Sequence, residues 1–154
     1  MKPYRWLVIG ILAFILVRVE HTGTQIDQLA PVETVMIKQE AGVVCVETDT
    51  GARGMGSDLE KAIANLHSSA PTKVFLDTAR YLLITSKTEN MLPQMYEILR
   101  PNTLVCTLRT EAELEEITRY LKTHPPKVRL RDIRAGKKKI QILYYQEGRG
   151  QLVE

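Results

Sequence analysis

The sequence predicts an α/β (α+β) fold with one mixed sheet, because short runs rich in β-branched residues alternate with amphipathic helical patterns. A chain of 154 residues is long enough for one domain and short for two. A continuous apolar run near the N-terminus predicts a membrane segment ahead of that domain. We therefore expect a signal anchor or transmembrane segment over residues 1–20, a stalk over 21–30 and a single domain over 31–154.

The expected order of elements is β-β-α-β-α-β-α-β-β. Strands are predicted where Val, Ile, Leu and Thr gather, over residues 32–38, 43–49, 74–85 (with a break), 103–108, 128–133 and 140–145. Helices are predicted to begin at Ser57, near Asn90 and near Thr110, each with leucine and isoleucine at helical spacing. The last two strands flank a lysine-rich turn and are expected to form a hairpin.

A glycine-rich stretch lies between the second strand and the first helix. Gly54 and Gly56 are interpreted as positions of a tight turn with positive φ or of close backbone approach, and Ser57 with Glu60 as a capping box that opens the helix. The stretch matches neither a phosphate-binding P-loop nor the G-x-G-x-x-G dinucleotide fingerprint. An exported ligand-binding or enzymatic domain that uses the Gly51–Ser57 loop stays open as an alternative.

The N-terminal apolar run is uninterrupted and is bounded by basic residues. Arg5 precedes it and Arg18 follows it. As a helix its 12 residues reach about 18 Å, which is short against a hydrocarbon core of about 30 Å but suits a signal sequence. The predicted anchor residues are Trp6, Leu7, Val8, Ile9, Ile11, Leu12, Phe14, Ile15, Leu16 and Val17.

The positive head predicts that residues before the apolar run stay inside and that the domain is exported. No A-x-A-like pair of small residues follows the run, which favours an uncleaved anchor over a cleaved signal peptide. We therefore expect a single-pass protein of the cell membrane whose domain is extracytoplasmic. Membrane lipid is the expected partner of the anchor, and a membrane protein is the expected partner of the domain.

Basic residues concentrate in the last 28 positions, whereas residues 19–126 carry 10 basic and 15 acidic side chains. The interpretation is a solvated outer face, and the functional alternative is contact with an anionic surface such as lipid headgroups. An exported domain rarely meets nucleic acid, so none is expected. The candidate contact residues are Arg129, Arg131, Arg134, Lys137, Lys138 and Lys139.

No pattern in the sequence predicts catalysis. His21, His67 and His124 have no metal-ligand spacing, and no G-x-S-x-G nucleophile elbow is present. Cys45 and Cys106 lie within predicted strands and are interpreted as buried thiols, with a disulfide as the alternative if their strands are neighbours. No cation near either cysteine is evident in the sequence. We expect no enzyme activity, no cofactor and no metal.

Three segments, in order, resemble the N-terminal domain of the spore germination receptor C-subunit family, Ger(x)C. They are Gln25–Ala30 (QIDQLA), Gly54–Ala62 (GMGSDLEKA) and Lys73–Ile84 (KVFLDTARYLLI). The second resembles the family's glycine turn into a helix, and the third resembles its K-L-F-L-G-H-L-R-x-x-x-I segment.

This resemblance implies an exported, membrane-associated protein of an endospore-forming bacterium that assembles with membrane partners. Family members carry a lipidated cysteine after the signal segment and a second large domain. Here no cysteine follows Val17, so that an uncleaved anchor takes the place of the lipid. The expectation is a short, divergent accessory protein of germination or sporulation.

Overall fold

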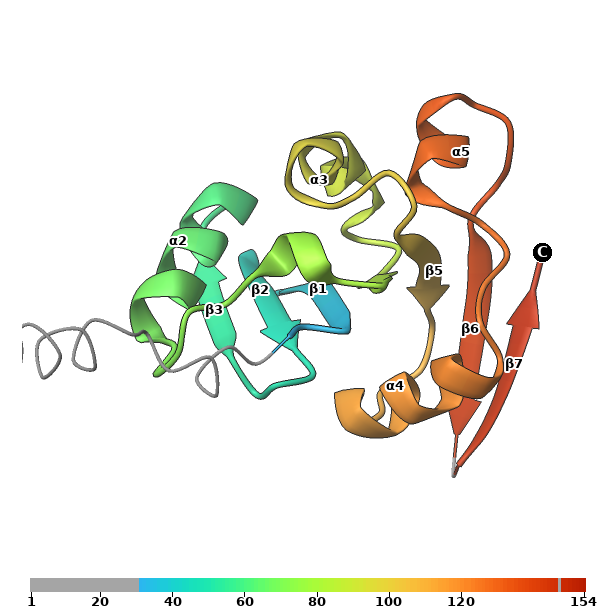
Figure 1. The fold of residues 1–154 in the computed structure, drawn as a ribbon, viewed down its shortest axis with the longest axis horizontal. Coiled ribbons are helices and arrows are strands. Elements are labelled where there is room, and N and C mark those ends of the chain that lie inside the picture. The colour runs from blue at the N-terminus through green and yellow to red at the C-terminus, as the bar shows by residue number, and fades with distance from the viewer. Residues whose placement is uncertain (1–30, 147) are drawn as a thin grey trace, which may run out of the picture.

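The structure is a computed structural model that describes residues 31–146 and 148–154. Within these residues, seven strands form one mixed sheet in the order β3-β2-β1-β4-β5-β6-β7 (Figure 1). The strands are β1 (Thr34–Glu40), β2 (Val43–Thr48), β3 (Arg53–Gly56), β4 (Tyr81–Ile84), β5 (Leu104–Leu108), β6 (Gln141–Gln146) and β7 (Arg149–Val153). The helices are α2 (Leu59–Ser69), α3 (Leu92–Ile98), α4 (Leu114–Thr123) and α5 (Leu130–Arg134), with 3-10 turns η2 (Leu76–Thr78) and η3 (Glu89–Met91).

The middle of the sheet is parallel. β1 pairs with β4, β4 with β5 and β5 with β6 in parallel, whereas β2, β3 and β7 pair antiparallel towards the two sides. Every side chain of β4 is buried, as expected for a parallel strand covered on both faces. The prediction of a mixed α/β fold with one mixed sheet is therefore confirmed for the domain.

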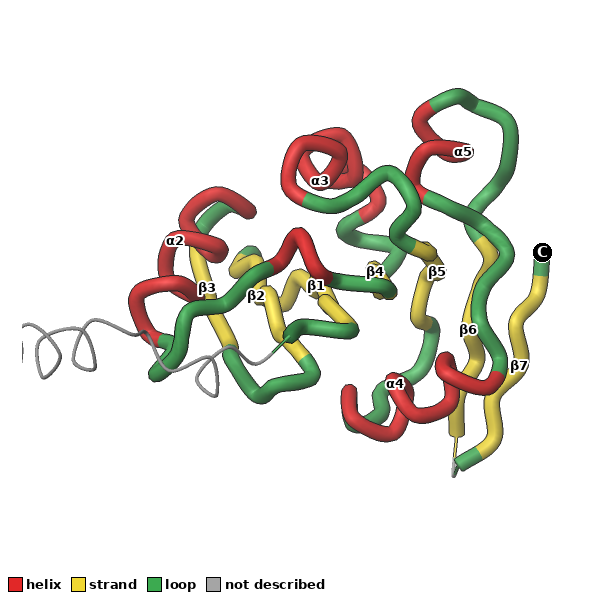
Figure 2. Tube along the Cα trace, in the orientation of Figure 1, coloured by secondary structure: helices red, strands yellow, loops and turns green. Residues whose placement is uncertain are grey.

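Helices cover both faces of the sheet, with α2, α3 and α5 on one face and α4 on the other (Figure 2). Alternation along each strand divides the core accordingly. Leu82 of β4 belongs to the cluster beneath α2, α3 and α5, and Leu83 belongs to the cluster beneath α4. Each is fully buried. Two separate hydrophobic cores thus pack against the same central strands from opposite faces of the sheet.

The glycine-rich stretch is a strand rather than a loop. β3 pairs with β2 and lies directly against α2. A Cβ atom on Gly54 would come within 2.2 Å of the Ala62 carbonyl oxygen, and one on Gly56 within 2.5 Å of the Ala62 nitrogen. Of the two predicted roles of these glycines, the tight turn is wrong at Gly54 and Gly56, and close backbone approach is confirmed.

The N-cap of helix α2 also lies one residue later than the predicted N-cap, Ser57. Asp58 is the N-cap, and its carboxylate accepts a hydrogen bond from the Lys61 N–H at 2.9 Å. Ser57 bonds to the Asp58 carboxylate instead of capping the helix. Glu60 then stands at the second helical position, one short of the position that a capping box requires. The predicted Ser57–Glu60 capping box is wrong because β3 extends to Gly56.

The predicted hairpin of residues 128–133 with 140–145 is wrong as well. Leu130–Arg134 forms helix α5, and Leu130 and Ile133, three residues apart, pack into the core beneath α3. The preceding backbone bridges to β5, with Val105 N–H donating to the Val128 carbonyl at 2.9 Å. Strand β6 pairs instead with β5 and β7.

The predicted membrane anchor and stalk, residues 1–30, lie outside the described residues. Among the residues that the structure does describe, no helix combines the length and the apolar character that crossing a membrane requires.

Replacing Gly54 by Ala tests the close approach of β3 and α2. We expect the Gly54→Ala variant to lose about 3 kcal/mol of unfolding free energy, because the added methyl group meets helix backbone that cannot move aside. Urea unfolding followed by circular dichroism measures the loss. The neighbouring Met55→Ala change is the control, since Met55 is 53% exposed and its loss should cost under about 0.5 kcal/mol. Equal stability of the two variants would contradict the packing argument.

Candidate functional site

A cleft of about 550 Å³ lies at the carboxyl ends of the parallel strands β1, β4 and β5. Its walls come from three segments far apart in the sequence: the end of β1 (Met36 and residues 38–40), the loop after β4 (residues 85–87) and the end of β5 with its loop (residues 108–112). We call this the switch-point cleft. In open α/β sheets, ligands bind in the crevice outside the carboxyl ends of the strands.

The crevice exists because two neighbouring loops turn to opposite faces. The loop after β4 leads to η3 and α3 on one face, and the loop after β5 leads to α4 on the other (Figure 2). A sheet whose adjacent connections diverge in this way leaves a gap between them. The position of the cleft therefore follows from the topology.

Hydroxyl groups fix both loops to the sheet. The buried Thr88 hydroxyl donates to the Ile37 carbonyl at 3.0 Å and accepts from the Thr85 N–H at 3.0 Å. The Thr110 hydroxyl accepts from the Tyr145 N–H of β6 at 2.9 Å. The two walls are thus held by hydrogen bonds to neighbouring strands, which suits a preformed site.

The charges in the cleft divide into engaged and unengaged groups. Lys38 contacts Glu47 at 3.2 Å and Glu40 at 3.9 Å. Lys87 and Arg109 are exposed, and among residues 31–146 and 148–154 neither forms an ion pair. The cleft therefore presents two uncommitted cations from two adjacent loops.

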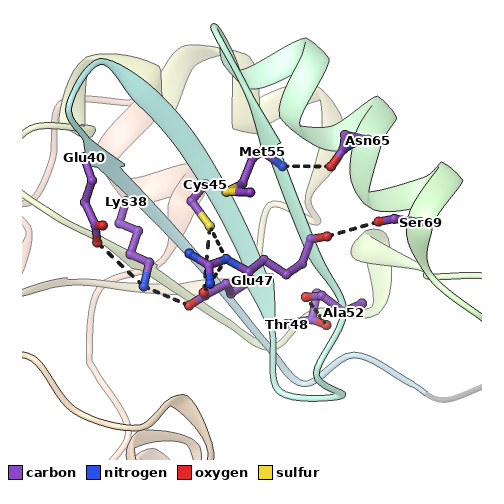
Figure 3. A network of polar contacts seen from close by, with 10 residues as sticks. Lys38, Glu40, Cys45, Glu47, Thr48, Ala52, Met55, Asn65 and Ser69 are labelled. Atoms are coloured by element: carbon purple, nitrogen blue, oxygen red, sulfur yellow. Dashed lines mark hydrogen bonds and ion pairs between the residues drawn. The ribbon is translucent and has the colours of Figure 1, made fainter.

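A second polar network joins Lys38, Cys45, Glu47 and Arg53 on strands β1, β2 and β3 (Figure 3). The Arg53 Nε atom lies 3.1 Å from the Cys45 Sγ atom and 3.0 Å from a Glu47 carboxylate oxygen. Lys38 reaches the other oxygen of Glu47, so this network adjoins the switch-point cleft. No cation near Cys45 was evident in the sequence. Arg53 supplies one because it pairs with Glu47 across β2 and β3.

This arginine does not activate the thiol. Burial raises the pKa of Cys45, the hydrogen bond from Arg53 opposes that rise, and the Glu47 carboxylate adds to it. The charge of Arg53 is already engaged by Glu47. Cys45 is thus a buried thiol in a charged setting, without the low pKa that nucleophilic cysteines need.

Cys106 is fully buried in the core beneath α4, and burial alone raises its pKa to about 12. Both cysteines are free. β1 and β4 separate β2 from β5, which places the two thiols three strand spacings apart, about 14 Å. The disulfide alternative is therefore wrong, and the interpretation as buried thiols is confirmed.

The structure does not bring the predicted site residues together. Gly54, Gly56 and their neighbours build β3 and its contact with α2. The six basic candidates are all exposed, but they lie on or beside α5 and on the loop that follows rather than on one face of a strand. None of them lines the switch-point cleft. The anchor residues lie outside the described part of the chain.

Sequence reasoning missed the cleft residues, although part of a signal was present. Thr85, Ser86 and Lys87 directly follow one buried strand, and Arg109 with Thr110 directly follows the next. Polar residues after successive parallel strands meet at one sheet edge. The sequence does not show on which face of the sheet the helix after each of these strands packs.

The described residues hold no cluster of three or more metal-ligating side chains. His67 and His124 are exposed, and the His124 ring stacks on Tyr120 with centroids 4.6 Å apart. His124 is the C-cap residue of α4 and does not line the switch-point cleft.

No protein-family model matches this chain, and neither a curated protein nor a solved structure matches it. The likeness to the germination receptor C-subunit family therefore stands on the three sequence segments alone.

Changing Glu47 to Gln tests the balance of charges at Cys45. We expect iodoacetamide to alkylate Cys45 roughly fivefold faster in the variant at a fixed, mildly alkaline pH. The carboxylate raises the pKa of the thiol, so that its removal lowers this pKa and increases the thiolate fraction. In both proteins the rate should rise with pH until the thiol is fully ionised. Mass spectrometry of digested samples measures both cysteines, and the buried Cys106 serves as the internal control. An unchanged Cys45 rate would contradict the assignment.

Proposed function

We propose that this chain is a membrane-anchored, non-catalytic interaction module of the cell envelope. Residues 6–17 anchor it, the domain faces the extracytoplasmic side, and the switch-point cleft is the surface that contacts a membrane-protein partner. The resemblance to the Ger(x)C family favours an accessory role in germination or sporulation.

The observation that carries the binding part of this proposal is the cleft itself. It lies where the loops after β4 and β5 diverge, its walls are pinned by Thr88 and Thr110, and two of its cations have no carboxylate partner among the described residues. A crevice outside the carboxyl ends of the strands is the usual ligand site of an open α/β sheet. The anchoring part rests on the sequence, namely the apolar run between Arg5 and Arg18.

The geometry gives less support to the two alternatives. A ligand site in the Gly51–Ser57 loop needs space at the glycines, and helix α2 occupies that space at Gly54 and Gly56. An anionic-surface site in the basic C-terminal region keeps one favourable observation, because Lys137, Lys138 and Lys139 are all exposed on one loop. This loop therefore serves as the comparison surface below.

The anchoring part makes a prediction about topology. A C-terminal fusion to alkaline phosphatase should be active in cells, and a C-terminal fusion to green fluorescent protein exported through the same route should be dark. The positive residues before residue 6 and the apolar run predict this orientation, with the C-terminus on the extracytoplasmic side. Replacing Ile11 and Leu12 with Glu should reverse both signals, since charges in the run oppose membrane insertion. A dark phosphatase and a fluorescent fusion in the unmodified chain would refute extracytoplasmic placement.

The binding part predicts that the full chain captures a membrane protein from detergent-solubilised membranes through the cleft. The double variant Lys87→Glu, Arg109→Glu should lose at least about tenfold of that capture, because both contacts turn repulsive. The variant Lys137→Glu, Lys139→Glu changes the net charge equally but lies on the basic loop, and it should capture normally. Quantitative mass spectrometry of the eluates measures the difference, and circular dichroism confirms that both variants fold.

If the loop variant loses capture and the cleft variant does not, the binding surface is the basic loop. If neither variant changes the captured set relative to an unrelated anchored domain, the interaction proposal fails.

A further inference from the structure

We propose that the switch-point cleft holds one anionic group, a phosphate or a carboxylate, between Lys87 and Arg109. This inference rests on the proposed function, because the group would belong to the partner that the cleft contacts. It adds the chemistry by which the cleft recognises that partner.

The first support is the state of the cations. Lys38 is held by Glu47 and Glu40 and has little charge to offer a ligand. Lys87 and Arg109 lie on the loops after β4 and β5, the two loops that diverge around the cleft, and neither has an ion-pair partner among the described residues. Two cations that line one cleft from two loops suit one shared anion, and an arginine can bind either a carboxylate or a phosphate with two parallel hydrogen bonds.

The second support is the backbone of the same loops. Within the described part of the chain, the N–H groups of Ser86, Lys87, Glu111 and Ala112 donate to no other protein group. Backbone N–H groups are strong donors, and these four belong to exposed or half-buried loop residues, where a ligand can take the place of water. Here they belong to residues that line the cleft. Donors of this kind, next to a lysine and an arginine, are the usual components of phosphate and carboxylate sites.

Two carboxylates of the cleft oppose the anion. Glu40 is one, and it contacts Lys38 at 3.9 Å. Glu111 also lines the cleft, is exposed and forms no ion pair within residues 31–146 and 148–154. Its carboxylate would repel a bound anion. Neutralising Glu111 should therefore strengthen binding, whereas neutralising either cation should weaken it. These opposite signs separate specific binding from general loss of structure.

The test uses the full chain in detergent micelles, with inorganic phosphate and acetate as separate probes at constant ionic strength. Nuclear magnetic resonance follows the backbone amides of Ser86, Lys87, Glu111 and Ala112, and a matched chloride titration is the control. We expect saturable shifts at these amides. Lys87→Gln and Arg109→Gln should each weaken binding about tenfold, and Glu111→Gln should tighten it. Lys137→Gln should change nothing.

Saturation by phosphate but not acetate assigns a phosphate-bearing partner, and the reverse assigns a carboxylate. Shifts that match chloride, or that Glu111→Gln leaves unchanged while Lys137→Gln reduces them, overturn the inference. If neither probe binds but Lys87→Glu with Arg109→Glu still abolishes capture, the proposed function survives and the anion inference falls. If the probes bind as expected but capture is unaffected, the anion site stands and the proposed function falls.

Discussion

Strand β4 is buried on both faces, and the arrangement of the molecule depends on that burial. Its four residues are each 1% exposed or less, and a buried leucine or isoleucine contributes about 1.5–3 kcal/mol relative to an exposed one. Covering both sides requires helices on both sides, so that α3 follows β4 on one face and α4 follows β5 on the other. The divergence of those two connections creates the cleft. The core and the candidate site thus have one physical cause.

The packing of α2 on β3 closes one of the two edges of the sheet. An edge strand exposes unpaired N–H and C=O groups that attract further strands. On β3 the Met55 N–H donates to the Asn65 side chain at 3.0 Å, and the Arg53 carbonyl accepts from the Ser69 hydroxyl at 3.1 Å (Figure 3). The glycines of β3 allow the helix to come near enough for these bonds. The backbone groups at the β3 edge therefore find partners on α2, whereas β7 forms the other edge of the sheet.

The sequence predicted the elements whose patterns reflect burial on the central sheet. Strands β1, β2, β4 and β5 were predicted near their observed positions because β-branched runs are the direct consequence of a pleated, buried strand. Strand β3 was missed since glycine disfavours strands, and only the packing of α2 explains glycine there. Helix α5 was missed because Val128 and Leu130 fit an alternating spacing, whereas the helical spacing of Leu130 and Ile133 is a weak signal over so short a segment. The cleft was missed because its walls, near residues 38, 86 and 110, meet only through the strand order.

The distribution of charge decides what kind of recognition the cleft can perform. The domain as a whole is close to neutral, with 18 basic and 16 acidic side chains over residues 31–154. Its long-range field is therefore weak, and at physiological salt such fields fade within about 8 Å. Attraction to Lys87 and Arg109 therefore acts only at contact distance. A cleft of this kind discriminates between ligands by their fit within its walls rather than by electrostatic accumulation of anions. The exposed lysines after α5 would act in the opposite way. Because an isolated contact-range ion pair is weak, the proposed anion would add little affinity by itself. The loops held by Thr88 and Thr110 are the surfaces placed to make further contacts around it.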